Sequence, residues 1–340
     1  MRTWPVVAVA AIIAWGSPAR AQLAPLTDPA QLGTAEDVLD KPKCKTGSKR
    51  WFVKCKDQQS YVHTNEGWLH VFHSYIDGVG GGYVGVGSDQ GLTLAAWARA
   101  EVAWLMDYDP PVVDVNRINR AFLLEADSPR AFVDLWKRDR ATVARARALL
   151  AAAYAGDPDL PDILDSYERY RHQLLHYYES VLHAGRHGAR RHFLHDAADY
   201  AWVRGLSQAG RIRVVKGDLL KDQALPGIAR AARALNVPIR VVYLSCAEQY
   251  WDYTQTFRDN MTGLPFDDRS VILRLLYSTR WGAQKLGSFH YIVQNGLDFQ
   301  KRLLDPEHKR VSRMMNHRKQ VHHGLHLIGL VTHSPGSAKP

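Results

Sequence analysis

The sequence Gly-Tyr-Val-Gly-Val-Gly-Ser-Asp-Gln at residues 82–90 and the sequence Ala-Trp-Leu-Met-Asp-Tyr-Asp at residues 103–109 decide the fold that we predict. The first is a short apolar run that ends in closely spaced glycines, and the second is an apolar run that ends in carboxylates. Gly87 and Asp107 are twenty residues apart, the spacing at which a nucleotide-binding βαβ unit places its ribose-binding acid. The sequence therefore predicts a site for a nucleoside-containing ligand.

Strand and helix patterns alternate along the chain outside these two stretches. Apolar runs bounded by glycine or polar residues predict strands at 83–87, 102–108, 211–216, 239–244, 268–276 and 290–293. Helical spacing and capping residues predict helices at 65–75, 88–100, 225–235 and 297–304. This alternation is typical of an α/β fold with a mostly parallel sheet and helices on both faces.

The segment between the second and third predicted strands is too long for a single crossover helix. Amphipathic patterns predict helices within it, so we predict a large α-helical insertion at residues 113–210. The Asp-Pro-Pro run at residues 109–111 is interpreted as the stop of the preceding strand. The other predicted divisions are an irregular lead-in at 22–60, the α/β domain at 61–112 and 211–330, and a tail at 331–340.

The first residues have the features of a secretory leader. Arg2 is followed by an apolar run at residues 6–15, and Ala19-Arg20-Ala21 matches the A-x-A cleavage pattern. We therefore predict a signal peptide at residues 1–21 and an exported protein, periplasmic or secreted, with no membrane span in the mature chain. The alternative is a short uncleaved anchor.

Cys44 and Cys55 lie on either side of a Lys-rich loop. In an oxidising compartment a disulfide between them would stabilise the fold by roughly 2–3 kcal/mol. The alternative is two separate thiols, and the sequence does not decide between the two. Cys246 lies in an apolar run and is predicted to be a small buried residue rather than a nucleophile.

Composition limits the classes of partner. A hydrophobic content of 46% indicates a globular protein, and the net charge of +10 falls to +8 once Arg2 and Arg20 leave with the signal peptide. Only residues 41–56 and 301–319 are locally basic, and the chain has no zinc-finger spacing and no RNA-binding aromatic signature. We therefore predict a solvated basic face and no specific nucleic-acid partner; a protein partner stays open.

The candidate site lies at the ends of the predicted strands. Gly85 and Gly87 allow a close approach of the backbone to a ligand, and the next helix begins with free N–H groups. Asp107 or Asp109 is predicted to accept hydrogen bonds from ribose hydroxyls, and Asp218 to meet an adenine amino group. Residues 245–251 follow the fourth strand, where catalytic groups usually project.

This order of motifs resembles the Rossmann-like methyltransferases that use S-adenosylmethionine. The resemblance covers residues 83 to about 304 apart from the insertion, and it implies S-adenosylmethionine as the cofactor. By that resemblance, the glycine loop corresponds to Gly85, Gly87 and Ser88, the ribose acid to Asp107 or Asp109, the adenine-contacting acid to Asp218, and the motif after the fourth strand to residues 248–251. Glu248 and Tyr250 are the catalytic candidates, Glu248 as a general base and Tyr250 as a stacking or positioning group, with a solvated carboxylate and simple packing as the alternatives.

The whole chain is also similar to a poorly characterised group of exported bacterial proteins built on this scaffold. Three stretches carry that likeness, at residues 85–90, 104–110 and 264–270. Two positions depart from the methyltransferase pattern, because Tyr83 replaces the usual acid before the glycines and Asp89 replaces the third glycine. Our first hypothesis is an exported methyltransferase-like protein that binds an adenosyl or related nucleoside ligand, with methyl transfer to an unknown acceptor. The two departures, and the cytoplasmic origin of S-adenosylmethionine, motivate the alternative, a non-catalytic envelope binding protein on a degenerate scaffold.

Histidine pairs at helical spacing are the remaining motif. They are His172/His176, His183/His187 and His192/His195, with a further cluster at residues 317–326. Such pairs can hold a metal, but no H-E-x-x-H motif is present, so exposed or locally hydrogen-bonded side chains are predicted and no metal is expected. The chain also contains no G-x-S-x-G elbow and no Walker loop, so neither motif-bearing hydrolases nor NTPases are indicated.

Overall fold

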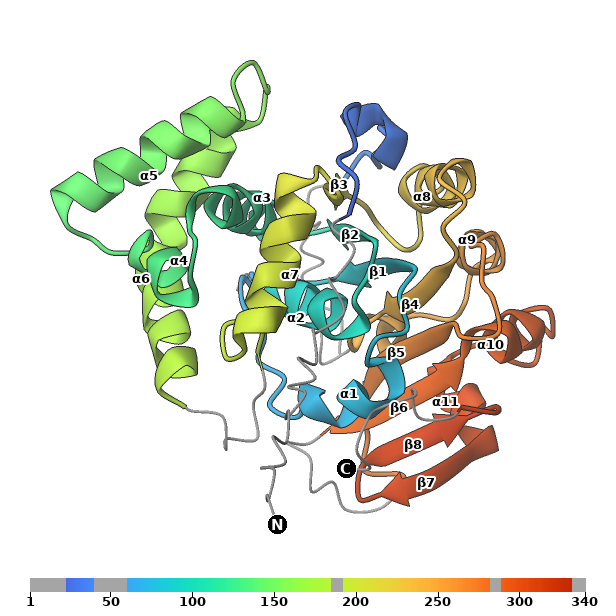
Figure 1. Cartoon of the computed structure of the whole chain (residues 1–340). Coiled ribbons are helices and arrows are strands. Elements are labelled where there is room, and N and C mark those ends of the chain that lie inside the picture. Colours follow the sequence, from blue (N-terminus) through green and yellow to red (C-terminus); the bar gives the residue numbers. More distant parts are fainter. Residues whose placement is uncertain (1–22, 40–59, 185–191, 282–288, 332–340) are drawn as a thin grey trace, which may run out of the picture.

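The computed structural model describes residues 23–39, 60–184, 192–281 and 289–331, and the predicted leader, Cys44, Cys55 and His187 lie outside these residues. The described residues form an eight-stranded sheet in the order β3-β2-β1-β4-β5-β6-β8-β7 (Figure 1). Strands β1 to β5 are parallel, and β6 runs antiparallel to β5. The strands are β1 Gly82–Val86, β2 Val102–Asp107, β3 Ile212–Lys216, β4 Ile239–Tyr243, β5 Val271–Tyr277, β6 Phe289–Asn295, β7 Arg318–His322 and β8 Leu325–Ile328.

The order β3-β2-β1-β4-β5 is that of a doubly wound, Rossmann-like sheet. The chain leaves β1 towards β2 and β3 on one side and returns to β4 on the other, so the direction of winding changes between β1 and β4. The predicted fold class, a mostly parallel α/β sheet, is therefore confirmed. Ligands of such sheets bind at the carboxyl ends of the strands beside this switch point.

The predicted helical insertion after the second strand is also confirmed. It contains α3 Pro110–Glu125, α4 Pro129–Asp134, α5 Arg140–Ala153, α6 Leu160–His183 and α7 Ala197–Gln208. The other helices are α1 His73–Ile76, α2 Asp89–Ala98, α8 Ala224–Ala234, α9 Gln255–Thr262, α10 Gly296–Leu303 and α11 Val311–Met314. Short 3₁₀ helices lie at η1 Pro29–Leu32, η2 Leu69–Phe72, η3 Ala247–Tyr250 and η4 Met315–His317.

The Asp-Pro-Pro run is more than a strand stop. Asp109 has extended backbone angles and occupies the N-cap of α3, and Pro110 is the first helical residue. Proline fits this position because its fixed φ suits a helix and its missing N–H has no helical partner there. Helical structure therefore starts ahead of the boundary that we predicted at residue 113.

Two apolar cores lie on the two faces of the sheet. Tyr83, Leu105 and Tyr243 point to one face, where α2 and the insertion cover them. Alternate strand residues such as Trp104 and Ile272 point to the other face, under α8, α9 and α10 (Figure 1). Burial at about 25 cal/mol per Å² of apolar surface makes these two cores the main source of stability.

The sequence analysis did not predict three of the observed elements, which are β7, β8 and α9. Strand β7 is polar, with Lys319 and His322 exposed, so it resembles a loop in sequence. Charged side chains of this kind protect an edge strand from pairing with another sheet.

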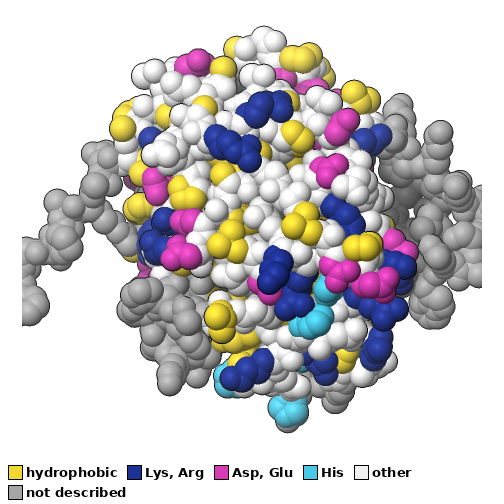
Figure 2. Space-filling model, turned by 90° about the vertical axis from the view of Figure 1, so that its right-hand side faces the viewer, with side chains coloured by type: hydrophobic (Ala, Val, Ile, Leu, Met, Phe, Trp, Pro, Cys, Tyr) yellow, Lys and Arg dark blue, Asp and Glu magenta, His cyan; other side chains and the backbone are white. Residues whose placement is uncertain are grey.

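The surface near this edge carries Lys, Arg and His side chains interspersed with Asp and Glu (Figure 2). This mixture favours the solvated basic face that the composition predicts. Among the described helices, none combines the length and the apolar character that crossing a bilayer requires.

Candidate functional site

The structure brings the glycine turn and the first acidic strand tip together. The Gly87 N–H donates to Asp107 Oδ2 at 2.8 Å, and the Asp109 N–H donates to Asp107 Oδ1 at 2.9 Å. Asn116 on α3 donates from Nδ2 to the Gly87 carbonyl at 2.8 Å. Burial raises the pKa of Asp107 to about 6, although these backbone donors lower it. In this structure Asp107 therefore braces the glycine turn.

Side chains of the protein itself cover both glycines of the turn. A Cβ at Gly87 would lie 2.0 Å from Gln90 Nε2, and a Cβ at Gly85 would lie 2.1 Å from the Tyr83 hydroxyl. Gly87 also has a φ of +95°, which disfavours any other residue. Ser88 is buried and donates from its backbone N–H to Gln90 Oε1 at 3.0 Å. Intramolecular packing therefore explains both glycines without a ligand.

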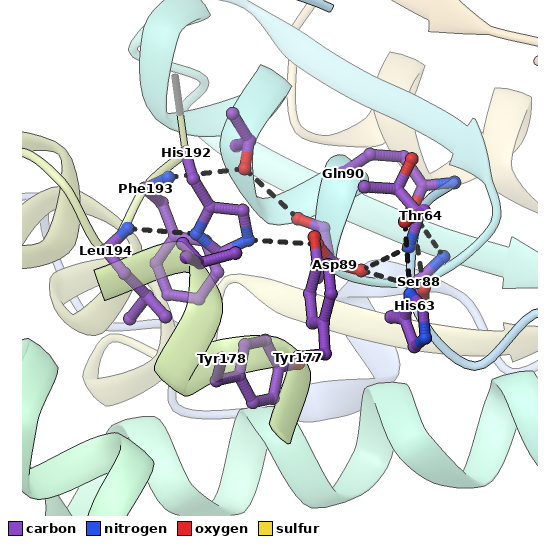
Figure 3. A network of polar contacts seen from close by, with 12 residues as sticks. His63, Thr64, Ser88, Asp89, Gln90, Tyr177, Tyr178, His192, Phe193 and Leu194 are labelled. Atoms are coloured by element: carbon purple, nitrogen blue, oxygen red, sulfur yellow. Dashed lines mark hydrogen bonds and ion pairs between the residues drawn. The ribbon is translucent and has the colours of Figure 1, made fainter. Parts of the chain in front are cut away.

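Asp89, the residue in place of the third glycine, is the centre of a buried polar network (Figure 3). It is fully buried and accepts hydrogen bonds from the Thr64 N–H at 2.8 Å, from the Tyr177 hydroxyl at 2.8 Å and from His192 Nε2 at 2.9 Å. Burial alone would raise the pKa of Asp89, but the His192 and Tyr177 contacts lower it below its usual value. This network fastens the insertion to the start of α2.

Some histidines of the predicted pairs are buried and hydrogen-bonded, and others are exposed. His192 is buried in the Asp89 network, and His195 Nε2 lies 2.6 Å from the Val181 carbonyl. His172 and His176 are exposed on α6. Within the described part of the chain, no group of three or more His, Cys, Asp or Glu side chains is arranged to hold a metal.

Three exposed tyrosines lie near the carboxyl ends of β2 and β4, and we call them the tyrosine rim: Tyr61, Tyr108 and Tyr250. Their exposed fractions are 61%, 63% and 48%, which is unusual for such large rings. Partial burial raises the pKa of Tyr108, with smaller contributions from Asp107, Asp109, Asp218 and Cys246. The Cys246 Sγ lies 4.0 Å from the Tyr250 hydroxyl. Carboxylates therefore lie around the Tyr108 ring, and Cys246 lies between Tyr108 and Tyr250.

Asp218 and Asp109 are half-buried parts of this edge. The Asp218 N–H donates to Asp37 Oδ2 at 2.9 Å, and Asp218 Oδ1 accepts from the Leu220 N–H at 2.9 Å. Burial raises the pKa of Asp109, while a hydrogen bond from Ser60 lowers it. Each carboxylate can therefore accept a further hydrogen bond, from a donor group of a ligand.

Glu248 lies on the opposite face of the sheet from the glycine turn. Its Oε1 lies 2.6 Å from Arg274 Nη1, and both side chains are fully buried. The Tyr253 hydroxyl donates to Glu248 Oε2 at 2.8 Å. Glu248 is thus neither solvated nor aimed at the rim, and this geometry favours a role in stability, whereas Tyr250 stands in the rim. The catalytic role that we predicted for Glu248 and Tyr250 stays a prediction.

A further carboxylate that the sequence analysis did not single out lies beneath the rim. Glu66 is 7% exposed and accepts hydrogen bonds from the Ser245 hydroxyl at 2.5 Å and from the Tyr243 hydroxyl. We call Glu66, Tyr243 and Ser245 the Glu66 cluster. No motif marks Glu66 in the sequence, because its partners are 177 and 179 residues away.

Replacing Glu66 by glutamine is expected to flatten the pH dependence of stability. Burial raises the pKa of Glu66 from 4.5 to about 7, although the Ser245 and Tyr243 hydrogen bonds lower it. The folded protein therefore keeps a proton that the unfolded chain releases, so the free energy of unfolding falls as the pH rises from 4.5 to about 7. This decrease in the free energy of unfolding amounts to about 3 kcal/mol, and it should be absent in the Glu66→Gln variant.

Urea titrations below pH 4.5, inside this interval and above pH 7 measure the effect. The raised pKa of Asp107 gives both proteins a slope of the same sign, so the difference between the proteins is what reports on Glu66. Equal slopes in both proteins would contradict the expectation.

The comparisons with known proteins add a family and a remote structural similarity. No curated protein matches this sequence. Two solved structures of the rRNA methyltransferase aviRa from Streptomyces viridochromogenes are similar to the chain. One has 12% identity and a TM-score of 0.34, with 73% of this chain and 94% of that chain covered. The other has 11% identity and a TM-score of 0.31, with 69% and 84% covered.

These scores are too low to carry an argument about activity, and our fold assignment depends on the strand order. One family model matches residues 61–329, which is most of the chain and includes the glycine turn, the rim and the Glu66 cluster. The chain therefore belongs to the family described as Domain of unknown function (DUF7790).

Proposed function

We propose that this protein binds a nucleoside-type ligand at the carboxyl edge of its sheet, between the tyrosine rim and Asp218. The observation that carries the proposal is the convergence of Asp109, Asp218 and Cys246 around Tyr108, near the switch point. Exposed aromatic rings stack on planar bases, and carboxylates accept hydrogen bonds from ribose hydroxyls and exocyclic amino groups.

S-adenosylmethionine is the first ligand to test. Its adenosine offers a base and a ribose, and its sulfonium is a cation, which suits a site of carboxylates and aromatic faces. In this proposal the ligand sits outside the covered glycine turn, so Gly85, Gly87 and Ser88 shape the edge and do not contact it. If methyl transfer occurs, it depends mainly on positioning an acceptor near the sulfonium.

A second candidate is a binding protein that has lost methyl transfer, and two observations favour it. Gln90 and Tyr83 cover the glycines, and Glu248 is held by Arg274 on the other face. Export, which we propose from the leader, also separates the protein from the compartment that makes S-adenosylmethionine. The two candidates share the ligand site and differ in turnover.

Calorimetry with S-adenosylmethionine, S-adenosylhomocysteine and adenosine tests the site. Tyr108→Ala and Asp218→Asn are each expected to weaken binding by about tenfold to a hundredfold, since base stacking and charge-assisted hydrogen bonds contribute about 1–3 kcal/mol each. Asp165→Asn is the matched control, because Asp165 is 68% exposed on α6 and should leave affinity unchanged.

The absence of heat with all three ligands would refute the proposal, as would equal affinities in the wild type, in Tyr108→Ala and in Asp218→Asn. Formation of S-adenosylhomocysteine from S-adenosylmethionine in the presence of candidate acceptors separates the two candidates. Binding without turnover supports the binding protein.

A further inference from the structure

Ser245 has an unusual backbone position at the end of β4. The strand ends at Tyr243, η3 begins at Ala247, and Ser245 between them has a φ of +48°. Residues other than glycine rarely adopt this left-handed conformation, and such strain collects at functional sites. A strained serine between a strand and a helix is also the arrangement that presents a nucleophile at the top of an α/β sheet.

The Ser245 hydroxyl is in contact with a base. It donates to Glu66 Oε1 at 2.5 Å, and the Tyr243 hydroxyl donates to the other carboxylate oxygen, Oε2. The Glu66 backbone N–H donates to Thr64 Oγ1 at 3.1 Å, which fixes the start of the segment that carries the base. Hydrogen bonds thus link the nucleophile Ser245 to the base Glu66, and the base to the orienting hydroxyl of Tyr243, as activated nucleophiles require.

The surroundings of Glu66 suit proton transfer near neutral pH. Burial raises the pKa of Glu66 to about 7, and the titratable groups that face it are Tyr83, Tyr243, Asp89 and Cys246. A base works best when its pKa is near the working pH. The Tyr83 hydroxyl is buried and has no hydrogen-bond partner among the described residues, so it is a donor not yet engaged.

We infer that Ser245 and Glu66 form a nucleophile–base pair that cleaves carboxylic esters. Ser245 Oγ forms a bond to the acyl carbon while its proton passes to Glu66, and the ester C–O bond breaks as the leaving alkoxide takes that proton. Water then attacks the acyl-enzyme and gives a proton to Glu66. The bond between Ser245 Oγ and the acyl carbon then breaks, Ser245 Oγ takes that proton back and is a hydroxyl again, and a carboxylic acid is released.

The usual glycines around such a serine are replaced by Tyr243 and Ala247, which explains why the sequence alone indicates no hydrolase. The tyrosine rim lies at the same edge of the sheet as Ser245, and Asp109 and Asp218 lie near its Tyr108 ring, so anionic esters are disfavoured. The substrate class is therefore a neutral or cationic ester with an aromatic or apolar part. This inference goes beyond the proposed nucleoside site and does not depend on it.

A fluorophosphonate probe, which reacts with activated serines, tests the pair on the full mature chain. Intact mass should show one adduct, and peptide mapping should place it on Ser245. Glu66→Gln should slow labelling by about a hundredfold, within the range that general-base catalysis contributes, and Glu66→Asp should restore part of the rate. Hydrolysis of p-nitrophenyl acetate should follow the same order.

Two further variants distinguish the loss of the nucleophile from the loss of the folded structure. Ser245→Gly suits the positive φ, so it should fold and lose the adduct. Ser312→Ala removes a half-buried serine on α11 and should label at the wild-type rate. An adduct on another serine, no adduct at all, or an unchanged rate in Glu66→Gln would overturn the inference. None of these results depends on nucleoside binding, which calorimetry measures separately.

Discussion

Replacing Arg274 by methionine should lower the free energy of unfolding by about 3–5 kcal/mol. Arg274 and Glu248 are both fully buried, 2.6 Å apart, on the face of the sheet that α9 and α10 cover. Arg274 also donates to Gln294, and its guanidinium lies 4.5 Å from the centre of the Phe299 ring. The single variant leaves the Glu248 carboxylate buried without its cation, and that uncompensated charge is the main cost.

Urea unfolding measures the change, and two comparisons show its origin. The double variant Arg274→Met, Glu248→Leu should recover much of the loss, because an apolar pair has no buried charge to leave unpaired. Arg145→Met removes a pair of the same length, 2.6 Å to Glu125, in which the arginine side chain is 63% exposed. It should cost within about 0.5 kcal/mol. If Arg274→Met costs no more than Arg145→Met, the buried pair does not stabilise the fold as we describe.

Asp89→Ala is the second large change and should also cost about 3–5 kcal/mol. It leaves the Thr64 N–H, the Tyr177 hydroxyl and His192 without their shared acceptor in a fully buried position. Because the folded pKa of Asp89 is lowered, its contribution is present above the unfolded pKa of 3.8 and is lost as the pH falls through the lower folded value. The variant should therefore lose this part of the acid sensitivity.

Hydrogen exchange locates the effect. In Asp89→Ala, amides of α6 near Tyr177 should exchange faster, since the network that holds this helix to α2 is gone. Asp165→Ala on the same helix is the control, because that side chain is 68% exposed and should change stability within about 0.5 kcal/mol. Unchanged exchange in α6 would mean that apolar packing alone fastens the insertion.

Local patterns predicted the central sheet well. The runs that end at Gly87, Asp107 and Gly217 are bounded by residues with clear conformational preferences, so each of these strands could be placed from the sequence. The insertion also followed from length alone, since no single crossover needs so many residues. Strands β7 and β8 were not predicted because they are short and partly polar, and they are strands only because β8 pairs with β6 and β7 pairs with β8.

The inner parts of the site could not be predicted in this way. Glu66 is an ordinary residue in sequence, and its role depends on Ser245, which is 179 residues away. The importance of Ser245 depends on a backbone angle that no sequence pattern shows. Asp89 was seen as a departure from the glycine motif, but its partners His192 and Tyr177 belong to the insertion, so the reason for the change appears only in three dimensions.

The separation of 103 residues between Asp89 and His192 has a consequence for biosynthesis. Chains leave the ribosome amino end first, at roughly 5–20 residues per second. The turn after β1 therefore waits several seconds for the histidine that completes its polar contacts. Under the export that we predict from residues 1–21, such a delay would keep the chain unfolded for longer.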